Sequence, residues 1–102
     1  MQDSTKKSAI IMQESDNVAT LIDEVNAGEL VTIVDADWST LFEVIALHPI
    51  EEGHKIATCP IPEGGNVVKY GFAIGIASAP IAGGEHVHVH NLDSQKGRGD
   101  KR

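Results

Sequence analysis

Histidine alternates with valine near the end of the chain, and imidazole is the side chain best suited to proton transfer near neutral pH and to metal binding. The run is His86-Val87-His88-Val89-His90-Asn91. A period of two with β-branched partners predicts a β-strand, in which every second side chain points to one face. We therefore expect the valines in a core and the imidazoles on the opposite face, about 7 Å apart. The alternative is a half-exposed strand whose polar face happens to be rich in histidine.

Two isolated lysines are the second feature that could do chemistry. Between Ser8 and Leu92 the chain carries twelve acidic residues but only two basic ones, Lys55 and Lys69. Two cations kept in an acidic domain suggest anion binding, either to the carboxylate or phosphate of a substrate or to an acidic group of a partner. The alternative is that both are ordinary surface lysines.

The composition describes one small acidic domain with few aromatic residues. The chain has 102 residues, a net charge of −7 and four aromatic side chains. At this size a core of Val, Ile, Leu and Ala is thin, so we expect a partner subunit or a homo-oligomer to bury a further face. The negative charge argues against nucleic acid and anionic membranes as partners. Because no apolar run suits a membrane span or a signal peptide, we expect a cytoplasmic protein.

One amphipathic helix is predicted near the N-terminus. Apolar residues follow the helical spacing i, i+3, i+4, i+7 at Val18, Leu21, Ile22 and Val25. Ser15 or Asp16 would cap its start, and Gly28 would end it. A single apolar stripe on such a helix would pack on a sheet. Strands are predicted on either side, over 8–12, 30–34 and 42–47, with helix as a competitor around 38–45.

A Pro-Ile-x-x-Gly pattern occurs three times in the second half of the chain, beginning at Pro49, Pro60 and Pro80. Each copy leads into a short strand, because proline fixes φ on the way into a turn and glycine allows a positive φ on the way out. Short strands and tight turns predict a mainly β domain. Its expected limits are 8–92, with a flexible N-terminus at 1–7 and a charged flexible tail at 93–102.

Three motifs follow one another in the second half. They are Gly53-His54-Lys55-Ile56-Ala57, Val68-Lys69-Tyr70-Gly71 with Ile74-Gly75 and Ala77, and Gly84-Glu85-His86-Val87-His88-Val89-His90-Asn91. In this order they resemble the SAF-type (β-clip) N-terminal module of the altronate/galactarate dehydratase family. Asp16-Asn17-Val18-Ala19 is also similar to the start of that module's helix. The resemblance covers about Ile10 to Leu92, departs mildly at Ala73 and Ser78, and is weak over 35–47.

The resemblance implies a barrel-like β-clip domain with one N-terminal helix, and a role in a lyase. The family dehydrates sugar acids such as altronate or galactarate to 2-keto-3-deoxy acids, usually with Fe²⁺. We therefore expect the small subunit of a two-subunit hydro-lyase, inactive alone, with the metal held mainly by a large catalytic subunit. The chain is also similar to the small subunit of sulfolactate sulfo-lyase. A sugar-acid-binding module without chemistry and a purely structural subunit remain as alternatives.

The resemblance also implies roles for polar residues of the motifs. His54, His88 and His90 are candidates for proton transfer. His88 and His90 are the expected metal ligands, and His54 could serve in either role. Candidates for binding the anionic substrate are Lys55, Lys69, Tyr70 and Asn91. His86 is the weakest of the histidines, because the family motif tolerates other residues there. We expect the imidazoles and the two ammonium groups to converge on one pocket mouth that a second polypeptide completes.

Overall fold

Nine short strands build the protein, whose structure, a computed structural model, describes residues 7–94. They are β1 (Lys7–Ile10), β2 (Val18–Leu21), β3 (Leu30–Val34), β4 (Thr40–Ile45), β5 (Lys55–Ala57), β6 (Asn66–Lys69), β7 (Phe72–Ala77), β8 (His86–Val87) and β9 (Leu92–Ser94). The expected mainly β class is confirmed. Within this range no helix could cross a membrane. The predictions for 1–6 and 95–102 lie outside the described residues.

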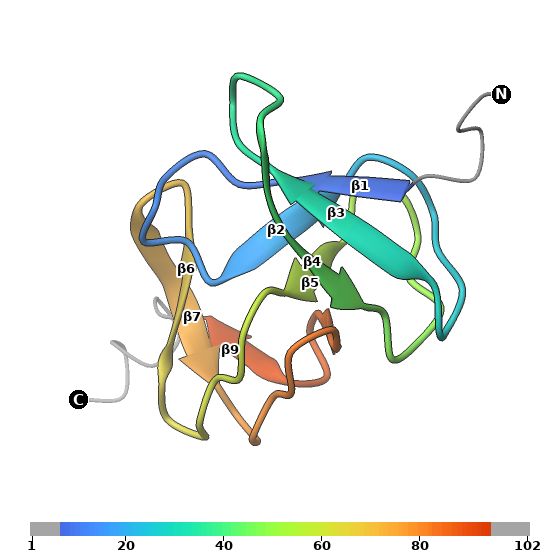
Figure 1. Cartoon of the computed structure of the whole chain (residues 1–102). Helices are drawn as coiled ribbons and strands as arrows, with labels where there is room; N and C mark the ends of the chain where they lie inside the picture. Colours follow the sequence, from blue (N-terminus) through green and yellow to red (C-terminus); the bar gives the residue numbers. More distant parts are fainter. Residues whose placement is uncertain (1–6, 95–102) are drawn as a thin grey trace, which may run out of the picture.

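The strands form two sheets, which Figure 1 shows packed against each other. One has six strands in the order β4-β3-β1-β2-β5-β8, and the other has three in the order β6-β7-β9. β1 and β3 run parallel, whereas the other paired strands are antiparallel. Neither sheet closes on itself over residues 7–94, so the expected barrel-like shape is an open one.

Two apolar cores lie on opposite faces of the central strands. Successive residues of β2 and β5 point to opposite faces, as the pleat of a strand requires. The first core takes Ala19, Leu21 and Ile56 from these strands. The second takes Val18 and Ala57, together with Val87 of β8. Among these strands, His86 of β8 and Lys55 at the start of β5 are polar and only partly buried.

The helix predicted between Ser15 and Gly28 is wrong, because Val18–Leu21 forms β2 in the middle of the larger sheet. A strand covered on both faces shows a run of apolar residues in place of alternation, and such a run can imitate helical spacing. Asp16, the expected cap, is buried and ties loops together instead. Its carboxylate accepts N–H groups from Met12 at 3.0 Å, Gln13 at 3.2 Å and Gly71 at 2.8 Å.

The Pro-Ile-x-x-Gly turns fold as predicted and lead into β5, β6 and β8. Their isoleucines are all buried, at Ile50, Ile61 and Ile81. Their glycines all have positive φ, at Gly53, Gly64 and Gly84. Ile61 pairs with Ile81, and Ile50 pairs with Val25, whose own turn ends at Gly28 with φ 91°. Gly28 therefore closes a fourth turn of this kind and caps no helix.

The other strand predictions agree with the structure. The segment 8–12 contains most of β1, 30–34 is β3, and 42–47 overlaps β4, so the helix that competed around 38–45 is excluded. The strands begin at Lys7 and end at Ser94, slightly beyond the expected domain limits of 8–92.

Candidate functional site

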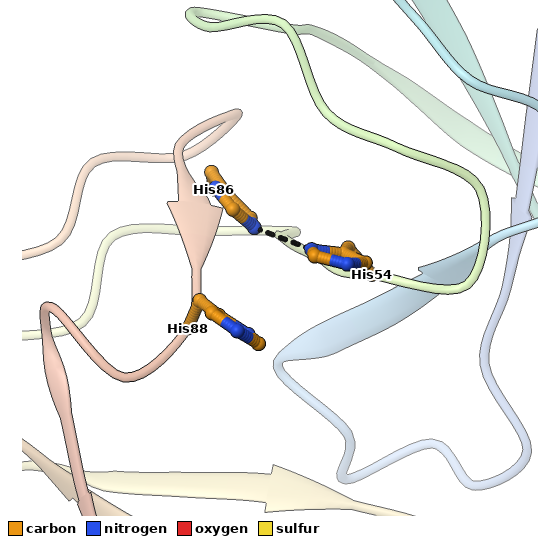
Figure 2. Close-up of side chains that lie close together, drawn as sticks. All are labelled: His54, His86 and His88. Carbon is orange, nitrogen blue, oxygen red and sulfur yellow. Dashed lines mark hydrogen bonds between the residues drawn. The ribbon is translucent and has the colours of Figure 1, made fainter.

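Four of the five histidines gather beside β8. The register pairs His86 with Ile56, and His54 lies two residues before Ile56, so both imidazoles leave the same face of the sheet. Figure 2 shows His86 on β8 and His88 just after it, both reaching toward His54. The ring centroid of His90 lies 5.4 Å from that of His86. These four side chains are called the imidazole cluster below.

The rings of the imidazole cluster are in direct contact. His54 Nδ1 lies 3.0 Å from His86 Nε2, a hydrogen bond in which one ring donates and the other accepts. The His88 ring stacks with both, with centroids 4.8 Å from His54 and 5.4 Å from His86. One ring nitrogen of each of these three residues lies within 4.8 Å of the others. The cluster therefore aims several nitrogens at one small volume.

The surroundings of His86 favour its uncharged ring. Burial, followed by the charges that His54, His90, His88 and His48 would carry, lowers the pKa of His86 below its usual value of 6.5. A carboxylate oxygen of Glu51 lies 3.6 Å from His54 Nε2. Because the Glu51 side chain is 84% exposed, water screens its negative charge, and it offsets the repulsion between charged rings only weakly. At neutral pH His86 is accordingly an uncharged imidazole, the form that can accept a proton or bind a metal.

Asn91 builds the turn that carries His88 and His90. Its side chain is buried, its Oδ1 accepts the His88 N–H at 3.0 Å and its Nδ2 donates to the His86 carbonyl at 2.9 Å. The strand expected through Asn91 therefore ends at Val87, and Val89 is 81% exposed instead of entering a core. These two backbone hydrogen bonds hold the turn that positions the imidazoles.

Lys55 lies on the other face of β5. Its register partners are Thr20 and Val87, whereas the next residue, Ile56, pairs with His86. Neighbouring residues of a strand point to opposite faces. The imidazoles and this ammonium group therefore do not share one side of the sheet, and the expected single group divides in two.

Lys69 and Tyr70 join Lys55 in a second group, called the lysine group below. Burial and then the charge of Lys69 lower the pKa of Lys55 from its usual value of 10.5. Lys69 Nζ lies 4.9 Å from the centre of the Tyr70 ring. Tyr70 and Gly71 both have positive φ, as in a two-residue hairpin turn, which holds the half-exposed Tyr70 ring at the end of β6. Two ammonium groups that repel each other in this way suit a bound anion.

Three imidazoles, one more than the expected pair of ligands, are close enough to hold a divalent metal ion. The pair expected as ligands was His88 and His90, but the structure brings His54 and His86 together with His88. Imidazole nitrogens suit zinc and iron, among other transition metals. His86 was expected to be the weakest of the histidines, yet its ring lies beside those of His54, His88 and His90. Its spacing of two residues from His88 was the signal that could have placed it on their face.

Comparison with known proteins agrees with these motifs. The family described as the altronate/galactarate dehydratase SAF domain matches residues 7–95. Altronate dehydratases of Bacillus subtilis and Escherichia coli are 41% and 45% identical over 83% and 74% of this chain, which spans only 16% and 14% of their lengths. The (2R)-sulfolactate sulfo-lyase subunit alpha of Chromohalobacter salexigens is 37% identical, over 85% of this chain and 94% of that protein.

Proposed function

The chain belongs to the altronate/galactarate dehydratase SAF-domain family, and on that basis we propose that it is the small subunit of a two-subunit carbon–oxygen lyase. Its reaction would dehydrate a sugar acid such as altronate or galactarate to a 2-keto-3-deoxy acid. The observation that carries the proposal is the match to 94% of a protein named as one subunit of a lyase. The two related altronate dehydratases support water as the leaving group.

A sulfo-lyase subunit is the second candidate, favoured by the same relative, whose name specifies sulfolactate. Both eliminations can begin with removal of the proton beside the carboxylate. They differ in the bond that then breaks on the next carbon, which is carbon–oxygen in the dehydratase and carbon–sulfur in the sulfo-lyase. The same small subunit could therefore serve either reaction, and the product distinguishes them.

We assign the proton transfers to the imidazole cluster. A ring of His54, His88 or His90 that is not bound to a metal can take the proton beside the carboxylate, and the resulting imidazolium can protonate the departing hydroxyl, which leaves as water. The enol that remains rearranges to the 2-keto acid. A bound divalent ion such as Fe²⁺, assigned mainly to the large subunit, would stabilise the negative charge of the enediolate.

The lysine group is assigned to anion binding. Lys55 and Lys69 carry the positive charge in an otherwise acidic domain, and Tyr70 borders them. Because Lys55 lies on the opposite face of β5 from His54, the anion is either a carboxylate remote from the reacting carbon or an acidic group of the partner subunit. Either role requires the two ammonium groups to act together.

The surface around β4 is assigned to the large subunit. Large apolar side chains are exposed on and beside this edge strand, at Leu30, Trp38, Leu41, Phe42, Ile45 and Leu47. A groove of about 390 Å³ opens next to it, between Phe42 and Met12. Concentrations of exposed apolar side chains mark protein contact surfaces, and β4 also has one unpaired backbone edge.

Reconstitution tests the proposal. The chain is mixed with a large lyase subunit encoded in the same genome, and keto-acid formation is followed with altronate and galactarate, and sulfite release with sulfolactate. We expect turnover only from the mixture. Sulfite release would select the second candidate. Full activity of the large subunit alone would contradict a catalytic role and leave a binding or structural module.

Substitution of His88 tests the catalytic assignment in the reconstituted enzyme. His88→Ala should lower kcat by roughly 10²-fold or more, the usual contribution of a general acid or base, while complex formation is unchanged. His48→Ala is the matched control, since His48 is exposed and lies outside the imidazole cluster. Equal turnover in both variants would show that this chain does not take part in the chemistry.

A further inference from the structure

We propose that His54, His86 and His88 form a divalent transition-metal site that this chain assembles without a partner. The three side chains come from two separate segments, the turn before β5 and the region of β8, and Figure 2 shows them directed toward one another. The inference requires neither the lyase reaction nor a large subunit. It also differs from the expected ligand pair, because it replaces His90 by two residues on the adjoining strand and turn.

The ring nitrogens of the trio lie near the separations that the ligands of one metal ion have. His54 Nδ1 and His86 Nε2 are 3.0 Å apart. With metal–nitrogen bonds of about 2.0–2.1 Å, atoms at that separation subtend about 90° at a shared ion, which is the angle of neighbouring ligands. The separations within the trio reach at most 4.8 Å. Rotation of half-exposed rings by roughly 1.5 Å closes them to tetrahedral or octahedral spacing.

Backbone hydrogen bonds hold each ligand in place before any ion binds. The His54 carbonyl accepts the Leu21 N–H at 2.9 Å, and the His54 N–H donates to the Glu51 carbonyl at 3.0 Å. His86 is paired with Ile56 in the sheet. The His88 N–H donates to the Asn91 side chain at 3.0 Å. A site built on anchored backbone loses little conformational freedom when it binds.

His54 also has a carboxylate near its second ring nitrogen, the position where metal-bound histidines commonly have a hydrogen-bond partner. Its Nδ1 faces His86, while its Nε2 lies 3.6 Å from a carboxylate oxygen of Glu51. At this distance the carboxylate makes no hydrogen bond, but if it closed on the far nitrogen it would hold the tautomer that leaves the other nitrogen free for a metal. In the metal-free protein Nδ1 shares a proton with His86 Nε2. An ion would take the place of that proton, which would move to the other nitrogen of the ring that carried it.

The chemistry of the trio selects the class of ion. Three neutral imidazoles without a carboxylate in the first coordination sphere suit Zn²⁺, Co²⁺, Ni²⁺ or Fe²⁺, whereas Mg²⁺ and Ca²⁺ require oxygen ligands. Three protein ligands leave at least one position open for water or for an oxygen of a hydroxy acid.

Cobalt titration of the tag-free chain, stripped with a chelator, tests the site. We expect one Co²⁺ per chain, with the visible absorption of nitrogen-ligated cobalt, displacement by Zn²⁺ and no competition from Mg²⁺. His86→Gln and His88→Gln should each weaken binding at least tenfold. His48→Gln, which removes an imidazole outside the trio, should leave the affinity unchanged, and circular dichroism checks the fold of every variant.

Two results would overturn the proposal. One is the absence of a saturable cobalt band in the folded chain. The other is equal binding by the three glutamine variants, which would mean adventitious binding by scattered histidines. Because neither the large subunit nor a substrate is present, a negative result here leaves the proposed lyase function to be judged by reconstitution alone.

Discussion

Asn91 determines, as a single residue, where two of the imidazoles lie. Its buried amide accepts the His88 N–H and donates to the His86 carbonyl. Asn91→Ala leaves both backbone groups without these partners, so the free energy of unfolding should fall by about 2–3 kcal/mol. Urea denaturation measures the loss. Asp93→Ala, at an exposed position two residues further on, should change stability by less than about 0.5 kcal/mol.

The lysine pair gives a second test at the residue scale. Burial and the charge of Lys69 both lower the pKa of Lys55. Lys69→Met removes the second cause and keeps the first, so the pKa of Lys55 should rise but stay below its usual value. NMR titration of the lysine side chains measures the change. No movement of the Lys55 pKa in the variant would mean that the two ammonium groups do not interact.

Single residues of the candidate site were partly predictable. The alternation of histidine with valine indicated that imidazoles share a face, and the motif containing His54 pointed to the correct turn. The sequence could not show that Asn91 would end the strand after Val87, because a side-chain hydrogen bond to a backbone two or three residues away leaves no trace in hydrophobic periodicity. The exposed Val89 lies in the turn that this bond closes, whereas His86 is placed by the pairing of β8 with β5.

Elements were predictable where local chemistry decides them. The Pro-Ile-x-x-Gly turns fold as expected because proline and glycine limit φ wherever they occur. β2 was mistaken for a helix because its conformation depends on β1 and β5, which pair with it along its two edges. Val18 and Leu21 enter different cores, a fact that only the assembled sheet reveals.

Edge strand β4 carries the prediction that belongs to the element scale. Phe42 is 42% exposed and lines the groove beside β4, so Phe42→Lys should weaken binding of the large subunit at least tenfold while the chain stays folded. Phe72→Lys makes the same change at a 73% exposed phenylalanine of the smaller sheet and should have little effect. Surface plasmon resonance compares them. Loss of self-association in place of partner binding would mean that a second copy covers β4.

Across the whole molecule, β5 separates two polar groups that the sequence suggested would meet. The imidazole cluster lies on the same face of the sheet as the first core, whereas Lys55 lies on the face that carries the second core. The mainly β fold class could be predicted from strand and turn patterns. The division could not, because it depends on which residue of β5 faces which residue of β8, a register that is set only when the sheets pack.

Gly84 connects distant parts of the molecule. It has a φ of 91°, its carbonyl accepts the Leu47 N–H at 2.9 Å, and a Cβ there would strike the Ile45 carbonyl. The end of β4 is thereby held against the turn that leads to His86. Gly84→Ala should therefore both destabilise the fold and disturb the imidazole cluster.

Gly53 provides the matched control, since its φ is 85° but nothing lies within 4 Å of its Cβ position. Gly53→Ala should cost about 1–2 kcal/mol, the backbone penalty alone. Gly84→Ala should cost more, about 3 kcal/mol or above, because the chain must also shift to relieve a backbone contact, and cobalt affinity should fall with it. Urea denaturation of both variants decides the matter. Equal losses would mean that the contact between Gly84 and Ile45 does not hold β4 to the cluster.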